Sequence, residues 1–441
     1  MSRTKKILVS TGAALGLSSV ALAQTADLDI DRAYAAELRA DASQHASLLQ
    51  AGGSGYDGAF HIGDASGNNR LNIGFLHQFR YIANFTDATD SSVVSEDYTG
   101  GFESQRGVIS FTGNVINPQV TFDVSLDLGL ANRGDDLPSI LRNAYVQYNF
   151  EGEGSGWYAR WGQFKVPVLN EENIHSGKQL AVERGPVNEF FTPSWSEGVM
   201  LGYTSDQFGV HFVVSDGIRT PVSVIGPTAS TTFNGADADL ALSARGDIKF
   251  MGAWEQFDDF TSFRGSDRAF KVGGGIHWQS GGDTGGPTAA PFSGKTADAE
   301  YWMWTVDCQY EADGYNLSAG YVGSTIDVTG SFDVTNHGVY VQGGLFVADQ
   351  WELFGRWDWL MFDEDFTPAG VGDKDYHYIT LGTNYYFVPE SHALKFTGDV
   401  IWALDNSAAA TTGGSTNLGD TGLQLGTDGE VALRLQLQVL F

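Results

Sequence analysis

Long stretches of this chain alternate strictly between apolar and polar residues. In residues 71–85, Leu71, Ile73 and Phe75 fall on one face of an extended chain, and Asn72 begins the opposite, polar face. Successive side chains of a β-strand point to opposite sides, so the alternation predicts a strand with one apolar and one polar face. At about fifteen residues, this strand is much longer than the five or six residues of an ordinary globular strand.

Fifteen further segments have the same character, and the connections between the sixteen alternate in length. Short turns such as 205–206 alternate with long loops such as 167–197. The exception is 251–267, which is long at a position where the alternation predicts a short turn. Outer-membrane barrels have even strand numbers, short periplasmic turns and longer outer loops. The segments are 71–85, 104–115, 119–129, 140–150, 157–166, 198–204, 207–216, 238–250, 268–279, 300–310, 315–323, 337–347, 350–360, 376–387, 392–404 and 431–441. The pattern predicts an all-β fold, an antiparallel transmembrane β-barrel of about sixteen strands.

Composition excludes several other classes of protein. With 25 Lys and Arg against 54 Asp and Glu, the formal net charge is −29, whereas a nucleic-acid-binding protein needs a basic surface. The single cysteine, Cys308, excludes intramolecular disulfides and cysteine-based zinc clusters. Beyond residue 23 no run of about eighteen apolar residues occurs, so a membrane role would require a closed barrel.

The N-terminal residues predict a targeting signal followed by a helix. Basic residues, an apolar run and the small-residue site Ala21-Leu22-Ala23 are typical of a secretory signal peptide. Residues 27–51 have helical spacing, which fits either a short periplasmic lid on the barrel or an oligomeric coiled coil. We therefore expect a signal peptide at 1–23, a helical extension with a Gly-rich hinge at 24–55, and an outer-membrane barrel at 56–441.

The last predicted strand carries a second indication of the outer membrane. Leu433, Leu435 and Leu437 alternate with Arg434 and polar residues, and the strand ends at an aromatic residue. This strand resembles the signal that the barrel-assembly machinery recognises, and Phe441 is the expected contact. We expect the mature protein in the outer membrane of a Gram-negative-type bacterium, in contact with its lipids and glycolipid.

A more specific resemblance lies in residues 102–203. The segments FESQRGVISFTGNV, VTFDVSLDLG, LRNAYVQYNFEG, WGQFKVPV, AVERG and GVMLGY follow one another in this order. Their order resembles that of the phosphate-selective porin O and P family. The resemblance implies a sixteen-stranded trimeric porin, a third outer loop folded inward to narrow the pore, and basic side chains along the diffusion path. Residues 167–197 fall at the position of that loop.

The resemblance and the strand parity together indicate candidate pore residues. The charged residues expected at the constriction are Lys165, Glu171, Glu172, Lys178, Glu183 and Arg184. Those expected to line the lumen are Arg106, Asp123, Asp127, Arg245, Lys249, Lys271, Arg356, Lys395 and Arg434. On the inward faces seven bases stand against nine acids, and the outer loops are acidic. These charges leave open whether the channel prefers anions such as phosphate or cations.

The predicted function is passive diffusion of small hydrophilic solutes or ions through a water-filled channel. The alternatives are a structural barrel that anchors an N-terminal cell-wall tether, a barrel enzyme acting on lipids, and a secreted soluble β-protein. No nucleophile elbow, metal-site histidine spacing or complete phosphate-binding loop is found, so no enzymatic activity, cofactor or metal is expected. Asp258-Asp259 and Asp363-Glu364-Asp365 are interpreted as solvated loop charges, with Ca²⁺ binding as the alternative.

Overall fold

The computed structural model describes most of the predicted barrel. The residues described are 53–56, 59–87, 96–129, 141–152, 154–217, 238–281, 299–328, 332–363, 375–405, 421–424 and 428–441. The predicted signal peptide and the helix expected at 27–51 lie outside this part of the chain. None of the helices among the described residues is long and apolar enough to cross a membrane.

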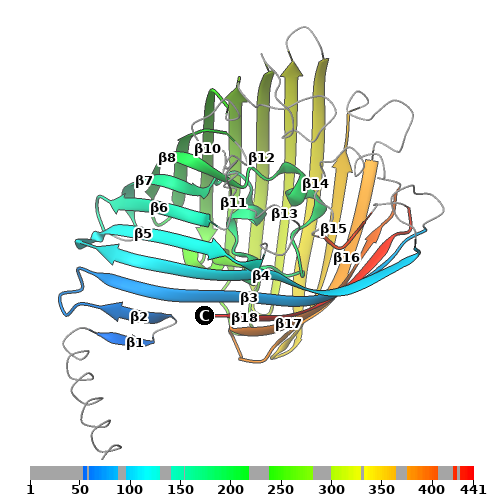
Figure 1. Ribbon diagram of the computed structural model, residues 1–441, viewed down its shortest axis with the longest axis horizontal. Coiled ribbons are helices and arrows are strands. Elements are labelled where there is room, and N and C mark those ends of the chain that lie inside the picture. The colour runs from blue at the N-terminus through cyan, green and yellow to red at the C-terminus, as the bar shows by residue number, and fades with distance from the viewer. Residues whose placement is uncertain are drawn as a thin grey trace, which may run out of the picture.

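Sixteen long strands, β3 to β18, form a closed antiparallel barrel (Figure 1). Each strand pairs with its neighbours in the chain, and β18 pairs with β3 from Val431↔Phe85 to Leu440↔Leu76, which closes the sheet. The strands are β3 Arg70–Phe85, β4 Tyr98–Val115, β5 Asn117–Asp127, β6 Leu141–Asn149, β7 Gly156–Lys165, β8 Trp195–Thr204, β9 Phe208–Ser215, β10 Leu240–Met251, β11 Ala269–Ser280, β12 Ala299–Ala312, β13 Tyr315–Val328, β14 Phe332–Ala348, β15 Trp351–Met361, β16 Asp375–Tyr386, β17 Leu394–Ala403 and β18 Val431–Leu440. The predicted sixteen-stranded barrel is confirmed. The main differences are that β4 and β14 begin about five or six residues earlier than expected, and that β13 ends at Val328, about five residues later.

Two short strands extend the sheet at one end of the seam between β3 and β18. β1, Ser54–Tyr56, pairs with β2, Phe60–Gly63, and β2 pairs with residues 70–73 of β3. β18 pairs with residues 76–85 of β3 and does not reach the start of that strand. β2 therefore pairs with the part of β3 that β18 leaves without a partner strand. Figure 1 shows this hairpin beside the start of β3, close to the end of β18.

Along the strands the apolar residues face outward and the polar residues face inward, which is the reverse of the arrangement in a soluble protein. On β18, Leu435 and Leu437 are 38% and 46% exposed on the outer face, whereas Arg434 and Gln436 are 0% and 2% exposed inside. Water-soluble proteins bury the apolar face of a sheet, but a strand in lipid presents it outward. The outer surface of this barrel therefore fits a hydrocarbon environment.

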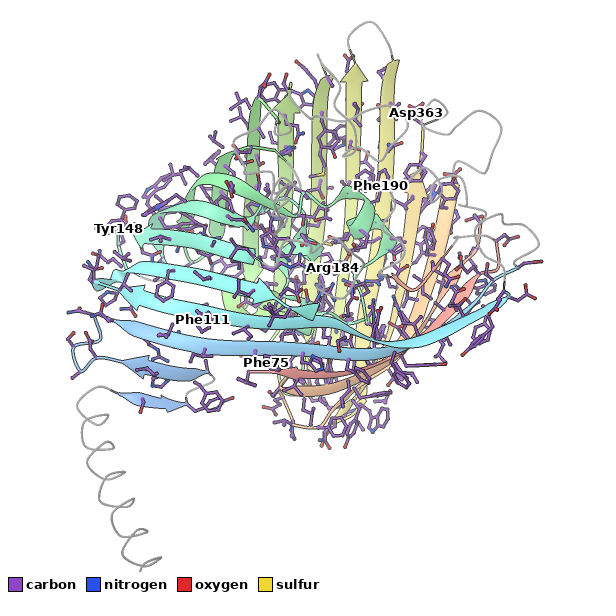
Figure 2. The ribbon with its side chains drawn as sticks, viewed as in Figure 1. Phe75, Phe111, Tyr148, Arg184, Phe190 and Asp363 are labelled. Carbon is purple, nitrogen blue, oxygen red and sulfur yellow. The ribbon has the colours of Figure 1, made fainter. Side chains whose placement is uncertain are left out.

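An apolar core nevertheless exists, and it lies inside the barrel. The connection between β7 and β8, residues 166–194 (the inner loop), folds into the lumen, where Phe190 and Phe191 are fully buried. These two rings belong to a buried cluster with Tyr301, Leu360 and Tyr376 of the barrel wall. In Figure 2, Phe190 and Arg184 of this loop lie within the barrel, whereas Phe111 and Tyr148 lie on the wall. The core fixes the inner loop against one half of the wall.

Three short helices shape the inner loop. They are α2 Asn170–Asn173, the 3₁₀ turn η3 Ser176–Lys178, and α3 Pro186–Phe191. Proline suits the first turn of α3 because its missing N–H would have no partner there. α3 packs on β14 and β15, so this part of the inner loop lies on the wall opposite β4 to β7 in the strand order.

The long connection between β10 and β11 also folds inward. It contains the 3₁₀ helix η4, Trp254–Asp258, and buries Phe257 and Phe260 to 4% and 1% exposure. A turn that filled no internal space would need only a few residues, so the unexpected length of this connection reflects the volume that it occupies inside the mouth of the barrel.

Candidate pore constriction

A large cavity lies between the inner loop and one half of the barrel wall. Its volume is about 1490 Å³. The strands that border it are mainly β4 to β9, through residues such as Ser110, Asp123 and Tyr158, and the inner loop closes its other side. The inner loop is packed on β12 to β17, so the open space lies mainly along β4 to β9. The lumen is therefore divided unequally.

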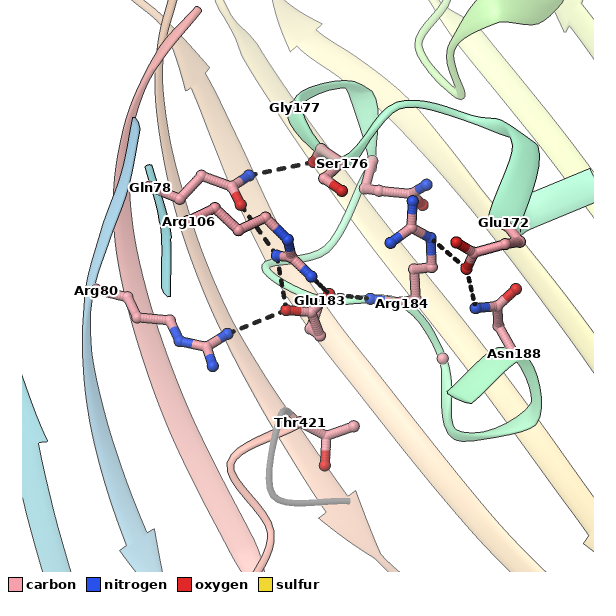
Figure 3. Close-up of polar contacts among 12 residues, drawn as sticks. Gln78, Arg80, Arg106, Glu172, Ser176, Gly177, Glu183, Arg184, Asn188 and Thr421 are labelled. Atoms are coloured by element: carbon pink, nitrogen blue, oxygen red, sulfur yellow. Dashed lines mark hydrogen bonds and ion pairs between the residues drawn. The ribbon is translucent and has the colours of Figure 1, made fainter. Parts of the chain in front are cut away.

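Glu183 attaches the inner loop to β3 and β4. Its carboxylate lies 2.7 Å from Nη2 of Arg106 and 3.3 Å from Nη1 of Arg80, as Figure 3 shows. Burial by itself would raise the pKa of Glu183, but the ion pairs with Arg106 and Arg80 lower it below its usual value. Glu183 is therefore an ionised anchor between two guanidinium groups.

Glu172 forms the second anchor, near the start of the inner loop. Its carboxylate lies 2.7 Å from Nζ of Lys165 and 3.3 Å from Nε of Arg184, and it accepts a hydrogen bond of 3.0 Å from the Asn188 side chain. Burial opposes ionisation, yet Arg184 and Lys165 hold the pKa of Glu172 well below its usual value. The network ties both ends of the loop together (Figure 3).

Glu171 points toward the opposite wall. It lies 2.9 Å from Nη1 of Arg356, and its Oε1 accepts a hydrogen bond of 3.0 Å from the backbone N–H of Gly185. Burial raises the pKa of Glu171, and Arg356 opposes that rise. Asp358 is a second carboxylate beside the same guanidinium, 3.2 Å from its Nε. These contacts fasten the loop to β15.

Several predicted lumen residues hold the inner loop, although Lys271 and Arg245 among them also border the cavity. Arg434 forms a buried bidentate pair with Asp399, whose Oδ2 also accepts the N–H of Val182 in the loop. Lys395 donates to the Gln179 carbonyl and Lys271 to the Asn170 side chain, both in the loop.

Arg245 is fixed in a similar way from β10. It is bound between Asp247 and Asp307 and donates to the carbonyl of Val168 in the inner loop. On the same strand, Lys249 is half-buried and its Nζ lies 5.1 Å from the centre of the Trp254 ring.

The other predicted residues border the cavity. Arg106, Asp123, Asp127 and Lys165 lie on its wall, and Glu172, Lys178 and Arg184 lie on its loop side. Of these, Asp127, Glu172 and Arg184 are buried, while Arg106, Lys165 and Lys178 are half-buried. The structure thus brings the residues expected at the constriction together, but not all of them reach the cavity surface.

Sequence reasoning missed two basic residues of the cavity wall, Arg142 of β6 and Arg160 of β7. The Arg160 guanidinium lies 4.1 Å from the centre of the Tyr145 ring, and that of Arg142 lies 4.6 Å from the centre of the Trp195 ring. The alternation of Tyr158, Arg160 and Phe164 along β7 would have placed Arg160 on the inner face.

The comparisons with known proteins agree with this architecture. The family model described as phosphate-selective porin O and P matches residues 78–426. The chain belongs to this family. It is an outer-membrane porin, a channel for small solutes. No curated protein sequence matches it significantly.

Solved structures resemble the porin in fold. OmpT of Vibrio cholerae has 15% identity and a TM-score of 0.51, over 84% of this chain and 98% of that one. An anion-selective porin from Comamonas acidovorans has 11% identity and a TM-score of 0.52, over 84% and 99%. The channel DcaP of Acinetobacter baumannii has 14% identity and a TM-score of 0.50, over 84% and 97%. At these identities the likeness concerns the barrel.

In three ion pairs at the cavity the base is more exposed than its acidic partner, and Arg106, at 12% against 2% for Glu183, is one of these bases. The Arg142 side chain is 24% exposed and that of its partner Asp127 is 1% exposed. Lys165 is 20% exposed against 4% for Glu172. Asp123, which is half-buried, accepts a hydrogen bond of 2.8 Å from the Asn143 side chain. At these three pairs the water in the cavity therefore meets the base in front of the carboxylate, whereas in the pair Arg245–Asp247 the carboxylate is the more exposed partner.

Proposed function

We propose that this porin passes small anions preferentially, through the space between the inner loop and the wall formed by β4 to β9. The observation that carries the proposal is the difference in exposure within three ion pairs at the cavity, Arg106–Glu183, Arg142–Asp127 and Lys165–Glu172. A buried carboxylate neutralises its partner in the overall count of charges, but a permeating ion approaches the exposed cation more closely. The preference is therefore local to the narrow part of the pore.

The acidic loops and the net charge of −29 do not contradict this preference. At an ionic strength of 0.1 M the field of an exposed charge is screened over about 10 Å. Charges on the outer loops thus act on the approach of an ion, whereas the charges within the narrow space act on its passage. The family name and the anion-selective structural neighbour favour the same class of permeant.

The experiment is a reversal potential in planar bilayers under a KCl gradient. We expect an anion-selective potential for the porin and a reduced one for the double variant Arg160→Gln, Lys178→Gln. Arg160 donates to Gln147 and forms no ion pair with any residue that the structure describes, so its replacement leaves the attachment of the inner loop intact. The matched control is Arg268→Gln, an exposed base that does not border the cavity. A cation-selective potential in the unmodified porin would refute the proposal.

We also infer that the porin assembles as a homotrimer, in contact with outer-membrane lipid, and has no enzymatic activity. A trimer form of OmpT from Vibrio cholerae, 13% identical with a TM-score of 0.51, supports this assembly. The mass of the protein–detergent complex measures it. For the barrel-assembly machinery we propose contact through the β18 end, where Phe441 exchanges backbone hydrogen bonds of 2.8 and 3.0 Å with Phe75.

A further inference from the structure

The connection between β10 and β11, residues 252–268 (the strap), crosses the mouth of the barrel at the end of the short turns. Near its start, Trp254 Nε1 donates a hydrogen bond of 2.7 Å to the carbonyl of Ser205, in the turn between β8 and β9. Further along, Thr261 Oγ1 lies 3.1 Å from the hydroxyl of Tyr386 on β16. The strap thus reaches from one side of the barrel to a strand far around its circumference.

The strap also contacts the inner loop. The backbone N–H of Phe260 donates to the carbonyl of Lys178 at 3.4 Å, and the Phe260 ring is buried with Ile174 and Leu180 of the loop. Gln309 of β12 and His392, beside β17, contact Asp259 from the wall. The strap and the loop therefore fill the same half of the lumen.

On its free side the strap borders the cavity, and there its charge is opposite to that of the wall. Trp254, Phe257 and Asp258 line the cavity, and Asp258 is exposed. Glu390, in the turn between β16 and β17, is a second exposed carboxylate on the cavity at this end. Two bases also border the cavity near this group: Lys178 of the inner loop, which is half-buried, and Lys271, which is buried with its Nζ 5.2 Å from the centre of the Phe257 ring.

We propose that the strap is a second constriction of the pore, at its periplasmic end, and that Asp258 makes this exit acidic. The exit lies in series with the basic wall around Arg106, Arg142 and Arg160. The proposal deepens the anion preference argued above and rests on it, since the two charged zones must have opposite sign.

A pore with a basic zone followed by an acidic zone conducts unequally in its two directions. Anions gather in the basic zone and cations in the acidic zone, because each zone attracts its counter-ion. When the periplasmic side is positive, both kinds of ion move toward the junction of the zones and the local concentration of carriers rises. When it is negative, both move away and the junction is depleted. The current should therefore be larger with the periplasmic side positive.

The asymmetry should also depend on salt. Screening acts over about 10 Å at 0.1 M and about 3 Å at 1 M ionic strength. At the higher concentration neither zone controls the ions across the width of the pore. We expect the ratio of currents at equal and opposite voltages to approach one in 1 M KCl.

The first test changes the charge at position 258. We expect Asp258→Asn to bring the current ratio at 0.1 M closer to one. For a larger change, Asp258→Cys in a Cys308→Ser background would be modified with a cationic or an anionic methanethiosulfonate. The cationic adduct should reduce or reverse the asymmetry, and the anionic adduct should keep it. The control is Arg268→Cys with the same reagents, because Arg268 is exposed but does not border the cavity.

The second test removes the strap. Met251 pairs with Phe270 across β10 and β11, so an Asn-Gly turn in place of residues 253–267 can join the two strands. We expect a higher single-channel conductance in this variant, with barrel formation checked by heat-modifiable gel mobility. An unchanged conductance in the folded variant, or an unchanged current ratio in the position-258 variants, would overturn the proposal. If the shortened chain does not fold, the position-258 variants decide.

The two proposals fail in different ways. A cation-selective reversal potential in the unmodified porin refutes the anion preference, while the conductance of the shortened variant still reports on the width of the exit. A symmetric current with an anion-selective potential refutes only the acidic exit.

Discussion

Glu183 attaches the inner loop to β3 and β4 through its ion pairs with Arg80 and Arg106. It is 2% exposed and lies between Arg106 and Arg80. Removing one partner of a buried ion network leaves the other charges without compensation, which typically costs about 3–5 kcal/mol. The same carboxylate lies behind Arg106, so it holds that base at the cavity surface. A single residue thus serves both the attachment of the loop and the charge of the pore.

The prediction at this scale is a weaker attachment of the inner loop in Glu183→Gln. Protease cleavage within residues 166–194 of the detergent-solubilised protein should increase, while the barrel stays folded. The control is Glu300→Gln, an exposed carboxylate on β12. Equal cleavage in the two variants would contradict the role of Glu183.

The same residue predicts a pH dependence. Because the folded pKa of Glu183 lies below its ordinary value of 4.5, its stabilising effect is present above pH 4.5 and is lost as the pH falls through the folded pKa. The difference in loop cleavage between the unmodified porin and Glu183→Gln should be constant from neutral pH down to about 4.5. Below that pH the difference should shrink, since the carboxylate of the unmodified protein becomes protonated too.

At the scale of elements, the inner loop is held by apolar packing as well as by charge. Phe190 is fully buried, and its ring centre lies 4.8 Å from that of Phe362 and 4.7 Å from that of Phe191. Such packing is unusual for the lumen of a water-filled barrel, whose inner face is normally polar. It explains why the loop occupies one side of the lumen and leaves the other open.

Truncation of this contact should loosen the loop without unfolding the barrel. Replacing a buried Phe with Ala costs about 3–5 kcal/mol of packing free energy. We expect Phe190→Ala to give noisier single-channel currents, because the loop would leave the wall more often. Phe250→Ala is the matched control, since Phe250 is 61% exposed on the outer face. Steady currents of unchanged amplitude in Phe190→Ala would argue against packing as the attachment.

At the scale of the whole molecule, the lumen is asymmetric around its axis. The inner loop and the strap fill the half next to β12 to β17, and the cavity runs along β4 to β9. Both halves present inward-facing polar residues, so the strands alone do not distinguish them. The difference arises from what is packed against each half.

Two serines test this division. Ser110 of β4 is half-buried and borders the cavity, whereas Ser318 of β13 is 1% exposed on the filled side. In a Cys308→Ser background, Ser110→Cys should react with a charged, water-soluble thiol reagent and lose conductance. Ser318→Cys should react much more slowly. Comparable reaction rates at the two positions would show that water reaches both halves.

The sequence determined the barrel. Whether a strand residue faces in or out follows from its position in a period of two, which is a local property and can be read along the chain. All sixteen strands and the inward position of residues such as Arg106 and Arg434 could therefore be predicted. The length of 251–267 could be noticed but not explained, because nothing local shows that a turn enters the lumen.

Only the tertiary structure decided which inward charges meet water. Arg106 and Arg356 look alike in the sequence, since each occupies an inward position in a long strand. Arg106 borders the cavity, whereas Arg356 is buried against Glu171 of the inner loop. The difference comes from where the inner loop docks, and that depends on side chains more than a hundred residues apart in the chain. Since a charge acts on ions only where it is exposed, the selectivity of the pore is a property of that docking.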